Sequence, residues 1–136
     1  MEINELTHQI IRYACSFRGW PGPAGKCLPK LPALRAAPNG FEGQAEFPIP
    51  VVYRGVKVDV GYRVDFLVED TVLVELKSIA ALQPVHEAIA LSYVRMSDRP
   101  VGLLINFHVL HLRDGIRRVV NQFPRQSIDQ LPRQSN

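Results

Sequence analysis

Apolar side chains recur every three or four residues at the start of the chain, and this spacing predicts an α-helix from Met1 to about Phe17. Residues 18–40 show no such period. They hold five prolines and four glycines, which interrupt both helices and strands. We therefore expect an irregular loop or linker between the first helix and the rest of the chain.

From Phe47 onward the pattern changes to short apolar runs and apolar–polar alternation, which is typical of β-strands. Arg54-Gly55 and Glu69-Asp70 are polar breaks between these runs, and we expect turns at both places. The pattern predicts an antiparallel meander whose strands cover residues 49–53, 56–60, 64–68 and 71–77.

A second helix is predicted from Pro84 to about Ser97, since proline suits the first turn of a helix. Val101–Phe107 is a continuous apolar run, the pattern of a strand that is covered on both faces. A strand, a crossover helix and a strand predict a parallel pair. The inner stripe of this helix is expected from Val85, Ala88, Ile89, Ser92 and Met96, with His86, Ile89 or Ala90, and Tyr93 on a neighbouring stripe.

The remaining segments complete an α/β (α+β) fold. We expect a short extended piece at residues 109–112, a last turn or strand at residues 114–120, and the N-terminal helix packed on the sheet. At 136 residues the chain is long enough for one domain, which we place at residues 1–123. Residues 124–136 are polar and are predicted to be a disordered tail.

Three charged residues interrupt the two central apolar runs: Asp65, Glu75 and Lys77. A two-residue loop at Glu69-Asp70 would place Asp65 and Glu75 on opposite faces of the sheet. A three-residue loop that includes Thr71, or a bulge, would pair them directly, with Cβ atoms about 5 Å apart. The second register is favoured because it also leaves Val64, Phe66, Val68, Val72, Val74 and Leu76 as an unbroken apolar face.

Two carboxylates at that separation repel each other unless a cation or a proton lies between them. Carboxylate oxygens suit a hard divalent ion such as Mg²⁺ or Mn²⁺. A lysine beside them could neutralise a phosphate or position a water molecule. The three residues together predict metal-assisted hydrolysis of a phosphodiester.

Composition narrows the class of protein only a little. A net charge of +3 is compatible with nucleic acid as a partner but does not require it. Arg113, Arg117 and Arg118 form a basic cluster that could meet phosphates, although a solvated surface is the commoner reason for such a cluster. Two cysteines suggest neither a zinc site nor a disulfide framework. No apolar run is long enough for a membrane span, so the cytoplasm is expected.

The order of elements around Asp65 and Glu75-Leu76-Lys77 resembles the PD-(D/E)XK nuclease superfamily. Within it, several motifs are similar to those of the small bacterial GxxExxY proteins: N-E-L-T-H-Q-I-I, F-P-I-P-V-V-Y-R-G-V-K-V-D-V-G-Y-R-V-D-F-L-V-E-D, V-E-L-K, V-H-E-A and G-L-L-I-N-F. The resemblance covers residues 1–17 and 41–123. It implies a restriction-endonuclease-like core and a metal-dependent nuclease.

In terms of this resemblance, Asp65 and Glu75 would be the metal ligands and Lys77 the catalytic lysine. His86 and Tyr93 would lie on the following helix, near the site, as accessory residues. For His86 the alternative is a capping or surface role near the start of the helix, and for Tyr93 it is packing.

The chain departs from the family pattern at two places. Residues 22–29, where the naming motif should follow the first helix, have neither its glutamate nor its tyrosine in position. Ile89 stands where the family usually has a glutamine, four residues before Tyr93. Codons for residues 26–30 can be chosen so that a one-base shift gives Glu-Ser-Val-Tyr-Gln. We therefore hypothesise a compensated pair of frameshifts ending near Phe41, which the nucleotide sequence decides.

Two functions of different classes remain open at this point. The first is a metal-dependent nuclease acting on DNA or RNA. The second is a non-catalytic module that binds nucleic acid or protein and keeps the nuclease fold. The intact Asp65, Glu75 and Lys77 favour the first function, and the altered motif and Ile89 favour the second.

Overall fold

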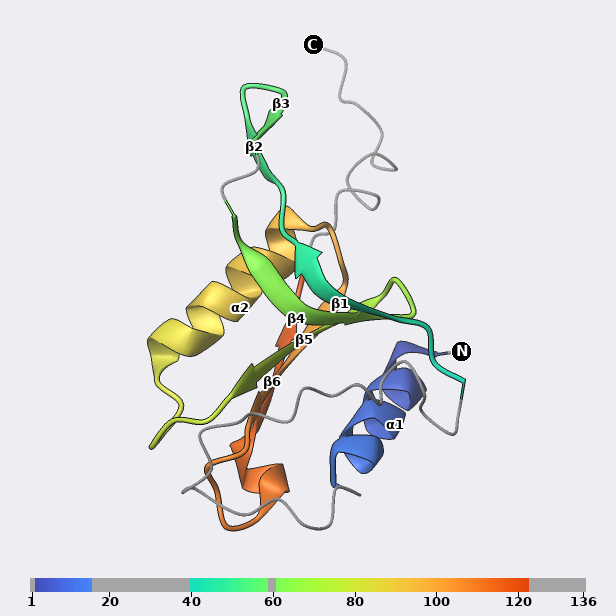
Figure 1. Ribbon diagram of the computed structural model, residues 1–136, viewed down its shortest axis with the longest axis vertical. Coiled ribbons are helices and arrows are strands. Elements are labelled where there is room, and N and C mark those ends of the chain that lie inside the picture. Colours follow the sequence, from blue (N-terminus) through green and yellow to red (C-terminus); the bar gives the residue numbers. More distant parts are fainter. Residues whose placement is uncertain (1, 16–39, 59–60, 123–136) are drawn as a thin grey trace.

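A five-stranded sheet forms the centre of the protein, with strand order β1-β4-β5-β6-β7 (Figure 1). The computed structural model describes residues 2–15, 40–58 and 61–122. The proline- and glycine-rich residues 18–39 and the predicted tail at 124–136 lie outside these ranges. The sheet strands are β1 (Gly43–Pro48), β4 (Arg63–Val68), β5 (Val72–Lys77), β6 (Val101–Asn106) and β7 (Ile116–Val120).

The predicted α+β fold is confirmed. β1, β4 and β5 are successive antiparallel neighbours, and β5 and β6 are parallel, joined by the crossover helix α2 (Pro84–Met96). β7 returns antiparallel to β6. The sequence pattern missed β1, because Gly43–Pro48 contains few apolar residues and lies on an edge of the sheet, where only one neighbour constrains it.

The two helices cover opposite faces of the sheet. On one face, Leu6 and Ile10 of α1 (Ile3–Cys15) pack with Phe66, Val74 and other β-strand residues in the larger buried cluster. On the other face, Val94 of α2 packs with Leu67 and Leu73. The central strands are therefore buried from both sides, which explains why β6 reads as a continuous apolar run.

The predicted inner stripe of α2 is wrong in most positions. Ala90 and Val94 are the buried residues of the helix, whereas Val85 and Ile89 are 56% and 44% exposed. Apolar residues occur around most of this helix, so their spacing did not distinguish the covered face from the open one. The neighbouring stripe that contains His86 and Tyr93 lies closer to the sheet.

Two smaller elements differ from the prediction or extend it. Residues 109–112 do not form the expected extended piece: the chain turns there and enters a 3₁₀-helix, η2 (Leu112–Gly115), before β7. The predicted meander is wrong in its first half, because β2 (Val51–Tyr53) and β3 (Val56–Val58) pair as a separate antiparallel hairpin and β1 takes the place beside β4. This hairpin projects away from the five-stranded sheet (Figure 1). Residues 59–60 of the predicted strand lie outside the described ranges.

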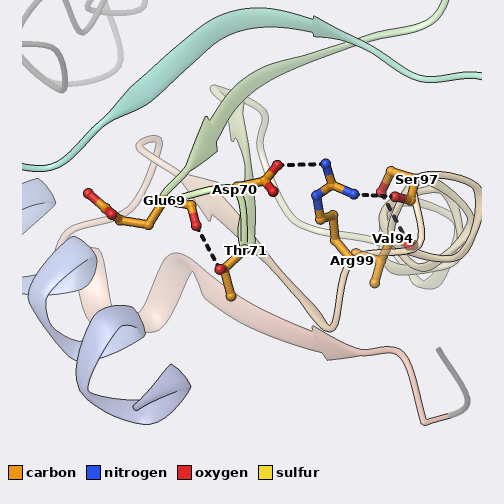
Figure 2. A network of polar contacts seen from close by, with 6 residues as sticks. All are labelled: Glu69, Asp70, Thr71, Val94, Ser97 and Arg99. Carbon is orange, nitrogen blue, oxygen red and sulfur yellow. Dashed lines mark hydrogen bonds and ion pairs between the residues drawn. The ribbon is translucent and has the colours of Figure 1, made fainter. Parts of the chain in front are cut away.

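A polar network joins the β4–β5 turn to the end of α2 (Figure 2). Arg99 donates from Nη2 to Asp70 Oδ1 at 2.7 Å and from Nη1 to the Ser97 carbonyl at 2.8 Å. Its guanidinium also lies 5.8 Å from the centre of the Phe47 ring. Because Asp70 is 77% exposed, the ion pair itself stabilises the fold by less than about 1 kcal/mol. The network fixes where α2 ends and β6 begins.

Candidate active site

The β4–β5 turn sets the position of the candidate site. Phe66, Leu67 and Val68 pair with Val74, Leu73 and Val72, which leaves Glu69, Asp70 and Thr71 in the turn. Glu69 and Asp70 both adopt φ of 52°, and the Thr71 amide donates to the Val68 carbonyl at 3.0 Å. The three-residue loop is confirmed, and the next pair in this register is Asp65 with Glu75.

At Asp65 the regular β4–β5 ladder stops. The Leu76 amide donates to Asp65 Oδ2 at 2.7 Å, so a side-chain carboxylate takes the place of a backbone acceptor. β4 itself continues, because Val64 and Arg63 still pair with β1. The two strands thus form a fork whose inner end is the Asp65 carboxylate, and this hydrogen bond holds that carboxylate in place beside Glu75.

The position of Glu75 disfavours the charged form of its carboxyl group. Burial, the Asp65 charge and a hydrogen bond with Asp65, partly offset by Lys77, together raise the pKa of its carboxyl to about 8. Within the described part of the chain, the buried Oε2 atom of Glu75 has no hydrogen-bond partner. A cation between the carboxylates would relieve the repulsion and would give this oxygen a partner.

These two carboxylates fit a divalent ion of the magnesium type. The described residues contain no group of three or more His, Cys, Asp or Glu side chains arranged for a metal. Mg²⁺ is commonly bound through only one or two carboxylates and keeps several water molecules. Asp65 and Glu75 match that pattern, whereas a structural zinc site, which needs four protein ligands, does not.

A cavity of about 130 Å³ lies against Glu75, between β5, β6 and α2. Its lining includes Leu104 of β6 and brings together six residues that the sequence pattern had singled out separately: Glu75, Lys77, His86, Ile89, Ala90 and Tyr93. Glu75 and Lys77 are two residues apart on β5, so both side chains leave the same face of the strand. Both charged side chains therefore line the same cavity, where a small group such as a phosphate could contact both of them.

His86 caps the start of α2 and also lines the cavity. Its Nδ1 atom accepts a hydrogen bond from the Gln83 amide at 2.8 Å, and its own amide donates to the Gln83 carbonyl at 3.0 Å. In the neutral ring the proton is therefore assigned to Nε2. The capping contact orients the ring, and it leaves an Nε2–H donor on a residue that lines the cavity.

Tyr93 extends the site toward the start of β4. Its ring centroid is 6.0 Å from that of Tyr62, with the planes tilted by 39°. Burial, the Glu75 charge and Tyr62 raise the pKa of the Tyr93 phenol, so it remains a hydrogen-bond donor at neutral pH. Sequence reasoning did not single out Tyr62. A tyrosine just before a strand gives no pattern that reveals its partner.

Asn106, a polar residue in an otherwise apolar run, is expected from the sequence to satisfy backbone groups at the strand end, and the structure confirms this role. It is buried at the end of β6 opposite Lys77. Its side chain accepts from the Ile79 amide and donates to the Ile79 carbonyl, at 3.1 and 3.0 Å. The Phe107 amide also donates to the Lys77 carbonyl at 2.9 Å. These bonds fix the backbone at Lys77 and two residues after it, at Ile79.

The structure does not bring the three arginines together on one face. Arg118 donates to Asn4 Oδ1 of α1 at 2.8 Å, and the adjacent Arg117 lies 3.4 Å from Glu87 of α2. These contacts are on opposite faces of the sheet, as expected for neighbouring residues of a strand. Arg113 is exposed in η2. A role for each arginine in contacting nucleic acid stays a prediction.

Comparison with known families agrees with this geometry. A family model described as the PD-(D/E)XK nuclease superfamily matches residues 32–119, which is more than half of the chain. The chain belongs to the PD-(D/E)XK nuclease superfamily. Asp65 and Glu75-Leu76-Lys77 lie within the matched range and follow the pattern of charged residues in the superfamily's name. No curated protein and no solved structure matches the chain.

Membership of the PD-(D/E)XK nuclease superfamily accounts for the architecture and points to nuclease activity in general. The mixed five-stranded sheet with a helix on each face fits a restriction-endonuclease-like fold. Superfamily members generally use divalent metals, and nucleic acid is their general substrate class. No described helix of this member has the length and apolar character needed to cross a membrane.

Proposed function

We propose that this protein is a metal-dependent nuclease that hydrolyses phosphodiester bonds of DNA or RNA. Asp65 and Glu75 are proposed to hold Mg²⁺ or Mn²⁺, and Lys77 to be the catalytic lysine. The observation that carries the proposal is the fork between β4 and β5. It holds the Asp65 carboxylate beside Glu75, whose buried Oε2 lacks a partner among the described residues, at a cavity that Lys77 also lines.

The residues around the cavity have separate roles in this proposal. A bound divalent ion would supply positive charge to the phosphate and lower the pKa of a water molecule. Lys77 presents an ammonium that offsets charge on the phosphate oxygens or orients the attacking water. His86 and Tyr93 act as accessory donors, through Nε2–H and the phenol, and the Gln83 contact keeps the His86 ring oriented.

We further propose that the protein is of the GxxExxY type, bacterial and cytoplasmic, because its motifs resemble that family in order. The naming motif falls on residues 22–29, outside the described ranges. The compensated frameshift therefore stays a hypothesis, to be tested on the gene.

An alternative has support from one contact. Ile89 lines the cavity and is 44% exposed, so an apolar side chain stands where the related motif has a polar one. A protein that kept the fold while losing polar contacts at the site would bind nucleic acid or a protein without cleaving anything. In that case Asp65, Glu75 and Lys77 are an inherited ion cluster.

Cleavage assays separate these functions. Wild type is expected to nick plasmid DNA or shorten single-stranded DNA or RNA with Mg²⁺ or Mn²⁺, and to lose this activity with a chelator. Asp65→Asn should abolish it, whereas Glu5→Gln, on the opposite face of the sheet, should leave it unchanged. If a folded wild-type sample binds these polymers without cleaving any of them in either metal, the binding module is correct.

A further inference from the structure

Tyr62, which lies beside the cavity, has no role in the metal and phosphate chemistry proposed above, and the ring face of Tyr93 is likewise not used there. Tyr93 lines the cavity with Glu75, and the Tyr62 ring lies 6.0 Å from the Tyr93 ring. Tyr62 is 48% exposed although it is a large, largely apolar side chain. Tyr62 therefore extends the site outward from the carboxylates, because its partly exposed ring packs against Tyr93, which lines the cavity.

The Tyr62 backbone is held firmly where β4 begins. Its carbonyl accepts from the Ile49 amide at 2.9 Å and from Arg63 Nη1 at the same distance. Gly61, with φ of 82°, makes the bend that leads into Tyr62. The backbone that carries the ring is therefore fixed and the ring already contacts Tyr93, which lowers the entropy cost of stacking a base against it.

Charge at this end of the site suits a polyanion. Arg63 follows Tyr62 directly, its side chain is exposed, and Lys77 lines the neighbouring cavity on β5. Basic groups that track a phosphate backbone beside aromatic rings that accept bases are the common features of single-strand binding surfaces. In a duplex the base faces are already stacked on one another, so an exposed aromatic ring adds little stacking energy to duplex binding.

We propose that Tyr62 and Tyr93 form a stacking platform for an unpaired base next to the scissile phosphate, which makes single-stranded nucleic acid the substrate. This inference rests on the proposed nuclease function, since it takes the phosphate to lie at Asp65 and Glu75. The exposed Tyr62 ring stacks on the base, and the Tyr93 ring supports it from behind.

Binding measured without cleavage tests the platform. Fluorescence anisotropy in a chelator would compare labelled 12-nucleotide oligo-dT and oligo-U with a blunt 12-base-pair duplex. Tyr62→Leu is expected to weaken single-strand binding on the order of 10-fold, as loss of one stacked base does, and to leave duplex binding unchanged. Tyr62→Phe keeps the ring and should bind within about 2-fold of wild type. Thermal unfolding of both variants checks that the fold is intact.

The stacking platform and the nuclease function are contradicted by different results. Single-strand binding that is equal in wild type and Tyr62→Leu overturns the platform, even if metal-dependent cleavage is present. Preference for the duplex in wild type overturns it as well. Ring-dependent single-strand binding in a protein that cleaves nothing supports the platform and overturns the nuclease.

Discussion

Glu75→Gln is expected to make the metal-free protein more stable at pH 8, although it removes a residue of the proposed active site. In wild type the Glu75 carboxylate is partly buried beside Asp65. Burial and, to a smaller extent, Asp65 raise its pKa from 4.5 to about 8. A glutamine at this position is neutral at every pH. Its amide can donate to Asp65 and so replaces the proton that the carboxyl otherwise carries.

The sign of the pH dependence follows from the raised pKa. Between pH 4.5 and about 8 the folded protein keeps a proton on Glu75 that the unfolded chain has released. Stability from this group is thus fully present below pH 4.5 and is lost as pH rises toward 8. The stability difference between Glu75→Gln and wild type should grow over the same window and level off above it.

The expected size is a few kcal/mol. A shift from 4.5 to about 8 corresponds to about 5 kcal/mol at full weight. Because Glu75 is only partly buried, solvent screening reduces this, and we expect about 2 kcal/mol. Urea unfolding with a chelator at pH 4.5, 6 and 8 measures the difference, and Glu5→Gln is the control on the exposed face of α1. A wild type that is as stable as Glu75→Gln at pH 8 would contradict this account of the site.

Lys77→Ala is expected to remove cleavage while leaving the metal site occupied. The ammonium lines the cavity beside Glu75 and is proposed to act on the phosphate or on the attacking water, not on the metal. Loss of one preorganised charged group at a reacting centre typically lowers kcat by about 10²- to 10³-fold. Lys77 also lowers the pKa of Glu75, so its loss should weaken metal binding slightly.

Rates measured at saturating Mn²⁺ separate these two effects. Lys77→Ala should keep a low kcat however much metal is added, whereas a defect in metal binding alone would be restored. Arg12→Ala, which removes one exposed cation from α1, is the matched control and should behave as wild type. Full activity of Lys77→Ala at high Mn²⁺ would show that the lysine only assists metal binding.

The pairing of Asp65 with Glu75 was predictable from the sequence because the burial of one apolar face determines the register of β4 and β5. Only the three-residue turn lets the apolar residues of β4 and β5 share a buried face and also pairs Asp65 with Glu75. That condition needs no knowledge of distant contacts. The crossover helix and the parallel strand β6 followed from equally local patterns, a proline at a helix start and a continuous apolar run.

The parts that were not predicted depend on contacts between distant segments. The buried face of α2 is set by Leu67, Leu73 and the strands around them, not by the helix sequence itself. Tyr62 gains its meaning only from Tyr93, thirty-one positions later in the chain. Both the buried face of α2 and the partner of Tyr62 are thus determined by tertiary packing, which the local sequence pattern does not specify.

Ile89, which departs from the related motif, bears on the reaction at the cavity more than on the metal site. The structure places Ile89 in the lining of the cavity. Under the proposed GxxExxY assignment, an apolar side chain then stands in this lining where that family usually has a glutamine. The carboxylates and the lysine do not depend on Ile89 for the contacts that position them. The metal site can therefore be intact even if the reaction is slow.

Direct measurement of metal binding tests the central claim most simply. Isothermal titration of wild type with Mn²⁺ at pH 8, where the raised pKa of Glu75 no longer opposes ionisation strongly, should show saturable binding. Asp65→Asn and Glu75→Gln should each lose it, and Glu5→Gln should retain it. Absence of saturable binding in folded wild type, or equal binding by all four proteins, would contradict a metal site at the β4–β5 fork.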